Sequence, residues 1–128
     1  RRERGLARFQ QVYAGDLPAP AAGQSAFFDL MLEQLFGEQW ERPQLSQRDR
    51  RLVTMGVIAA LGERDTFGIQ VRAAVKLGEL SPEQVREMLI HLAQYAGYPR
   101  VAGLIAVVER TLSELAGAAP APEKPKDA

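Results

Sequence analysis

The stretch SPEQVREMLIHLAQYAG, residues 81–97, predicts a complete helix and indicates the fold class. Ser81 is a favourable N-cap, Pro82 suits the first helical position, and Gln84 can complete a capping box. Apolar residues then recur at three- and four-residue steps, the period of a helix with one buried face, until Gly97. The same period recurs along the chain without any alternating strand pattern, so we predict an all-α fold.

Helical periodicity predicts five further helices, separated by glycine, proline or polar turns. They are expected over residues 1–14, 26–36, 46–61, 66–77 and 99–117, with a connector at 16–23, Gly37 as a stop and a loop at 38–45. Residues 52–61, LVTMGVIAAL, are expected to form the central buried helix, because only one residue in ten is polar. Residues 1–117 are predicted to be a single helical domain, and residues 118–128 a disordered tail.

Composition narrows the possible functions. The 128 residues carry 16 Lys+Arg and 16 Asp+Glu, so a net charge of zero gives no footprint for nucleic acid or an anionic membrane. No cysteine is present, which excludes disulfides and thiolate metal sites, and His91 as the only histidine excludes a His-rich metal site in one chain. No apolar run is long enough to span a membrane and no signal peptide is found, so we expect a cytoplasmic protein.

Three arginines crowd the expected start of the third helix. Arg48, Arg50 and Arg51 lie within its first turns, where positive charge opposes the helix dipole. This arrangement favours an anionic ligand or an acidic partner. The alternative is that these arginines are exposed and pair with Asp49 or Glu41.

One candidate acid–base group lies on the helix at 81–97. Glu87, His91 and Tyr95 are spaced by four residues, so they lie on one side of the helix, beside its apolar face. Glu87 could orient the imidazole, His91 could move a proton, and Tyr95 could donate a hydrogen bond. The alternative is a histidine packed at a helix–helix boundary and satisfied by Glu87. A second polar residue, Gln70, falls inside the apolar face of its helix and must find partners there.

Four segments match a known family in their order and spacing. They are GEQWERPQLSQRDR at 37–50, AALG at 59–62, VRAAV at 71–75 and EQVREMLIHLAQYAGYP at 83–99. The chain resembles the carboxymuconolactone decarboxylase family, within the superfamily that includes alkylhydroperoxidase D. The resemblance implies six helices, assembly into trimers or hexamers, and a cofactor-free decarboxylase that acts on a small lactone carboxylate during breakdown of aromatic compounds.

Decarboxylation without a cofactor requires only a few kinds of side chain. The site must bind a carboxylate, stabilise the developing oxyanion and protonate carbon, which needs no metal or thiol. We expect His91 to carry the proton, with Glu38, a carboxylate matched to the family, as the alternative acid. We expect Trp40, Gln70 and His91 to line one cavity. The other predicted substrate-binding residues are expected nearby: Tyr95 and at least one of Arg48, Arg50 and Arg51.

The sequence departs from the family at two places. The Cys-x-x-Cys pair of the peroxidase branch is missing from residues 63–66, and Gln70 stands where the family usually has histidine. Glutamine forms hydrogen bonds but carries no proton at neutral pH. The alternatives are therefore a related cofactor-free lyase or isomerase of a biosynthetic pathway, or a non-catalytic binding subunit. Apolar surface on the second and third helices also predicts a homo-oligomer.

Overall fold

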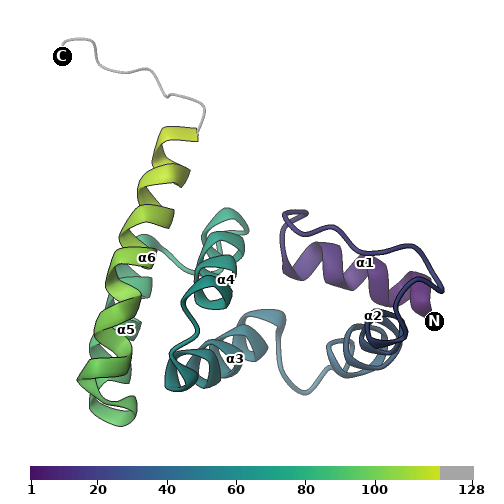
Figure 1. Ribbon diagram of the computed structural model, residues 1–128, viewed down its shortest axis with the longest axis horizontal. Coiled ribbons are helices and arrows are strands. Elements are labelled where there is room, and N and C mark those ends of the chain that lie inside the picture. The colour runs from purple at the N-terminus through teal and green to yellow at the C-terminus, as the bar shows by residue number, and fades with distance from the viewer. Residues whose placement is uncertain (119–128) are drawn as a thin grey trace.

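The computed structural model describes residues 1–118, and every regular element in that range is a helix. The all-α prediction is confirmed (Figure 1). Residues 1–118 form six helices when α2 and the π-helical segment η1 are counted as one, because α2 runs directly into η1. The elements are α1 (Arg2–Val12), α2 (Ala26–Leu30), η1 (Met31–Gln39), α3 (Gln47–Leu61), α4 (Arg64–Lys76), α5 (Pro82–Ala96) and α6 (Tyr98–Ala118). No helix of residues 1–118 is both long and apolar enough to cross a membrane.

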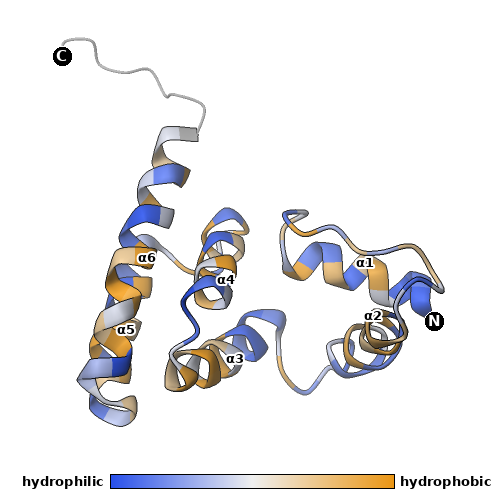
Figure 2. Cartoon of the chain, in the orientation of Figure 1, coloured by the Kyte–Doolittle hydropathy of each residue, from blue (hydrophilic) through white to orange (hydrophobic). Residues whose placement is uncertain are grey.

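Helices α3 to α6 enclose the larger of two hydrophobic cores. Helices α5 and α6 run side by side, and α4 packs against α6 (Figure 1). These helices carry many apolar residues (Figure 2), which pack into one cluster in which Met55, Phe67 and Leu104 are completely buried. Helix α5 begins as predicted, with the Ser81 side chain accepting from the Gln84 backbone and the Gln84 side chain accepting from the Ser81 backbone.

The N-terminal helices form a second, smaller core. Helix α1 lies against η1 at the far side of the molecule from α5 and α6 (Figure 1). The core consists of Phe9, Val12, Leu32, Phe36 and Trp40, and the rings of Phe36 and Trp40 stack with centroids 5.8 Å apart. Hydrophobic packing therefore holds each part of the chain together but does not by itself join the two parts.

Gly37 does not end the second helix, contrary to the prediction. The helix continues as η1 to Gln39, since Gly37 serves a close helix crossing instead of a C-cap. A Cβ on Gly37 would lie 3.0 Å from the backbone oxygens of Arg1 and Leu32, and one on Gly5 would lie 1.6 Å from the Leu32 oxygen. The glycines let α1 and η1 pack backbone to backbone.

Helix α3 is buried on one face only, which corrects the prediction of a central buried helix. Met55, Ile58 and Ala59 face the core, whereas Val53 and Val57 are exposed. Apolar composition alone could not reveal this division, because both faces of the helix are apolar. Leu77, the last residue of the helix predicted at 66–77, lies just beyond the end of α4 at Lys76 and is exposed.

A buried guanidinium joins the two parts of the chain. Arg51 of α3 is fully buried and donates from Nη1 to Gln70 Oε1 at 2.8 Å and from Nη2 to the Val12 carbonyl at 2.7 Å. Its Nε donates to the carboxylate of Glu79. Burial raises the pKa of Tyr13, opposed by the charge of Arg51 and a hydrogen bond with Gln70, so the phenol remains protonated. Polar contacts thus supply the link that the hydrophobic cores do not.

The Gly5→Ala variant is expected to lose about 3 kcal/mol or more of unfolding free energy, because the new Cβ would overlap the Leu32 carbonyl. Urea denaturation measures the loss. Gly117→Ala in α6, where a Cβ meets nothing within 4 Å, is the control and should not destabilise the protein. Equal stability of the two variants would contradict the close crossing of α1 and η1.

The Arg51→Met variant is expected to lose about 3 kcal/mol, because the buried amide of Gln70 and the carboxylate of Glu79 lose their donor. Arg72→Met is the matched control: it breaks an exposed ion pair with Glu114 and should cost about 1 kcal/mol at most. Thermal and urea unfolding compare the two variants. A loss at Arg51 no larger than at Arg72 would show that the buried network does not join the two parts.

Candidate functional site

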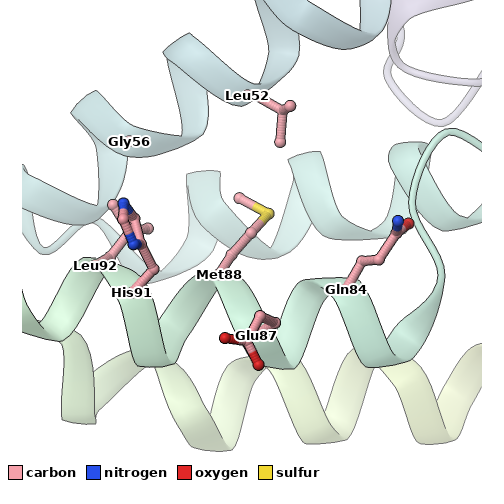
Figure 3. A pocket seen from close by; sticks show the side chains of 7 residues that line it. All are labelled: Leu52, Gly56, Gln84, Glu87, Met88, His91 and Leu92. Carbon is pink, nitrogen blue, oxygen red and sulfur yellow. The ribbon is translucent and has the colours of Figure 1, made fainter.

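A hollow of about 360 Å³ lies between α3 and α5 (Figure 3). Met88 and His91 extend from α5 toward α3, and Leu52 extends from α3 toward them (Figure 3). We call this the His91 hollow; its lining residues are Leu52, Gly56, Gln84, Glu87, Met88, His91 and Leu92. It combines an apolar wall with the only histidine of the chain.

The predicted contacts among Glu87, His91 and Tyr95 on α5 are present only in part. The His91 and Tyr95 rings are in contact, with centroids 5.0 Å apart, although Tyr95 is 80% exposed. The Glu87 carboxylate points away from α3, and no hydrogen bond joins it to His91 (Figure 3). Glu87 therefore does not orient the imidazole here, and His91 is exposed at the hollow instead of packed at a closed boundary.

Trp40 lines a different hollow, of about 180 Å³, between η1 and α3. Gln39, Arg50 and Thr54 supply its polar side chains. Arg50 Nη2 donates to the Arg42 carbonyl at 2.9 Å, while its buried Nε has no hydrogen-bond partner among the described residues. We call this the Trp40 hollow; it is lined by Leu35, Gln39, Trp40, Leu45, Arg50, Val53 and Thr54.

The structure does not bring Trp40, Gln70 and His91 into one cavity of a single chain, which corrects that expectation. Gln70 is buried in the Arg51 network and lines neither hollow. The other two lie on different sides of α3, because Arg50 and Gly56 are roughly 120° apart around the helix axis. The inward face of Gln70 was predicted correctly, but it meets Arg51, not a substrate space.

The three arginines of α3 have separate surroundings. Arg51 is committed to Glu79, Gln70 and Val12, and Arg48 donates from Nε to the Glu79 carbonyl at 2.8 Å. Arg48 also lies 3.9 Å from Asp49, a long and partly exposed ion pair. Arg50 alone of the three lines a described hollow and retains an unpartnered buried donor, so it is the best placed to bind a carboxylate.

The two acids near Trp40 in the sequence form ion pairs with arginines near the N-terminus. Glu38, the alternative proton donor, is exposed and pairs with Arg1, and it lines neither hollow. Glu41 pairs with Arg8 at 2.9 Å instead of with an α3 arginine, and the Arg8 hydrogen bond lowers the pKa of Glu41. Neither carboxylate directly faces His91.

Sequence reasoning missed the α3 wall of the His91 hollow. Gly56 interrupts an apolar helical run, and a Cβ there would meet nothing within 4 Å. A glycine in the interior of a helix lowers the stability of that helix, so its presence there usually has a packing or functional reason. Gly56 was therefore the signal in the sequence that pointed to this wall. Within residues 1–118, no three histidine, aspartate or glutamate side chains gather into a group able to hold a metal ion.

Comparison with known proteins covers both hollows. Residues 25–110 match the model of the carboxymuconolactone decarboxylase family. Over 85 residues the chain is 34% identical to a 4-carboxymuconolactone decarboxylase of Acinetobacter baylyi, which is 66% of this chain and 62% of that protein. Over 87 residues it is 29% identical to the nitrosuccinic acid decarboxylase npaB of Metarhizium robertsii, which is 68% of this chain and 60% of that protein. The match thus spans about three-fifths of each relative, and the chain belongs to the carboxymuconolactone decarboxylase family.

Proposed function

We propose that the chain is a decarboxylase subunit that acts on a small carboxylic acid without a bound cofactor, with His91 as the proton carrier. The observation that carries the proposal is the placement of the only histidine in an apolar hollow of a decarboxylase-family fold. Both relatives are named for the decarboxylation of small acids, one a lactone acid and one a nitro acid. A role in the breakdown of aromatic compounds and a cytoplasmic location are finer parts of this proposal.

The chemistry follows from the lining of the His91 hollow. The bond between the substrate carbon and its carboxylate breaks, carbon dioxide leaves, and the electron pair stays on carbon, delocalised into an electron-withdrawing group. The apolar side chains of Leu52 and Met88 favour this step, because a charged carboxylate becomes neutral carbon dioxide. The His91 imidazolium then donates its proton to carbon and recovers one from water.

Gln84 can stabilise the developing oxyanion. Its Oε1 accepts from the Ser81 backbone, which fixes the amide at the hollow and leaves its nitrogen as a donor. A neutral amide donor stabilises negative charge without competing as an acid.

A non-catalytic binding subunit is the second candidate, and the Arg51–Gln70 pair favours it. The position where the family usually has histidine is held by an amide bound to a buried guanidinium. Absence of turnover with every lactone or nitro acid, combined with retained binding of those acids, would support this second candidate over the first.

The His91→Ala variant is expected to lower kcat roughly 10²–10⁴-fold, the usual contribution of one general acid–base group. Release of carbon dioxide from 4-carboxymuconolactone and from nitrosuccinic acid is the measurement. Gln94→Ala, which removes an exposed amide of the same helix outside the hollow, is the control and should keep parental turnover. Unchanged turnover in active His91→Ala protein would move the proton transfer to Glu38 or to the substrate.

The Gln70→His variant is expected not to raise turnover. The Gln70 oxygen accepts from Arg51, so an imidazole there would keep an unprotonated nitrogen toward the guanidinium, which also lowers the imidazole pKa. Such a histidine is a poor proton donor at neutral pH. An increase in turnover of roughly tenfold or more would show instead that position 70 can perform proton transfer beside Arg51.

A further inference from the structure

The two hollows divide the groups that decarboxylation requires. The His91 hollow has a proton carrier but no arginine or lysine in its lining. The Trp40 hollow has the Arg50 guanidinium and the Thr54 hydroxyl but no acid–base group. Since they lie on different sides of α3, one small acid cannot touch both within one chain.

The surface between the hollows is apolar and exposed. Val53, Val57 and Leu61 form a stripe along α3 at four-residue spacing, and they are 62%, 56% and 65% exposed. Beyond the Trp40 hollow the apolar surface continues over α2, where Phe27 is 76% exposed. An apolar surface of this extent is typical of a contact with another protein.

The charges at its two edges are complementary, which favours a second copy of this chain as the partner. Within residues 1–118, Arg42 and Arg50 form no ion pair with an acid, and Glu87 forms none with a base. The exposed edge of α5 with Glu87 and His91 therefore complements Arg50 of the Trp40 hollow, and Arg42 whose carbonyl Arg50 contacts, in another copy. Because the contact joins two different patches, it is head-to-tail and can close into a ring.

We propose that the active site is shared between two copies, with His91 from one and Arg50 and Trp40 from the next. This inference rests on the proposed function and assigns the two carboxylates of such a substrate to different subunits. The Arg50 guanidinium holds the carboxylate that the product keeps. The departing carboxylate lies in the apolar His91 hollow, where its bond to carbon breaks and His91 supplies the proton for the new carbon–hydrogen bond.

Subunit mixing tests the shared site. Arg50→Gln and His91→Ala chains are each expected to lose activity as homo-oligomers, Arg50→Gln by roughly tenfold or more through weaker substrate binding. When the two are co-expressed in equal amounts, random assembly gives about one site in four with both native side chains, so about a quarter of parental activity returns. The control mixture of Arg50→Gln with the Arg50→Gln/His91→Ala double variant contains no complete site and should stay inactive.

The outcomes separate the two proposals. Active parent protein without recovery in the mixture overturns the shared site and leaves the decarboxylase proposal in place. Parent protein that releases no carbon dioxide from either acid overturns the decarboxylase proposal and with it the shared site. Recovery to about a quarter supports both.

Val57→Asp provides a test that does not depend on turnover. Val57 is exposed, so the variant should keep the helical circular dichroism of the parent while light scattering shows that it has become a monomer. Trp40 is the only tryptophan, so its fluorescence reports binding of succinate as a dicarboxylate probe in the Trp40 hollow. We expect succinate to bind the parent roughly tenfold more tightly than the variant. A monomeric parent, or equal succinate affinity in parent and variant, overturns the shared site.

Discussion

The buried guanidinium of Arg51 is the interaction on which the arrangement of this protein depends. The two hydrophobic cores are separate, so packing alone does not set the position of α1 and η1 relative to α3. Arg51 is the buried part of the link, through polar contacts that reach the end of α1, helix α4 and the turn before α5, and the Arg8–Gln47 and Lys76–Asp16 contacts add to it nearer the surface. A charge buried this completely is tolerated because its partners satisfy it, and removal of any of them leaves an unpaired polar group in the interior. The junction is therefore specific in geometry.

That junction also sets where the candidate catalytic groups lie. Arg50 precedes Arg51 in α3 and lies about 100° away around the helix axis. With Arg51 fixed in the interior, Arg50 therefore points toward Trp40. The Gln70 side chain accepts a hydrogen bond from the Arg51 guanidinium. A neutral amide suits this position because it accepts the hydrogen bond without adding charge. Proton transfer in the proposed reaction consequently falls to α5, where His91 lies at an open hollow.

Local signals in the sequence predicted most of the helices. The capping box of Ser81 and Gln84 depends only on neighbours in the chain, and the structure forms it as expected. Periodicity likewise placed Gln70 inward, since one helix face suffices for that inference. Gly37 was misinterpreted because its role depends on the crossing with Gly5, which is 32 positions earlier in the chain. The sequence of one segment alone does not show that a distant segment will pack closely against it.

The candidate site was harder to predict, because it depends on which side of α3 each residue occupies. Arg50, Arg51 and Leu52 are consecutive, yet one lines the Trp40 hollow, one is buried in the junction and one lines the His91 hollow. A helix that turns by about 100° per residue distributes neighbours in this way, and the apolar composition of α3 conceals it. The exposed valines and Leu61 belong to neither core. They lie between the His91 hollow and the Trp40 hollow, each of which lacks a group that the proposed reaction needs. This position is explained if the same surface joins two copies and completes the site, because apolar contact between copies would exclude water from the reacting carboxylate.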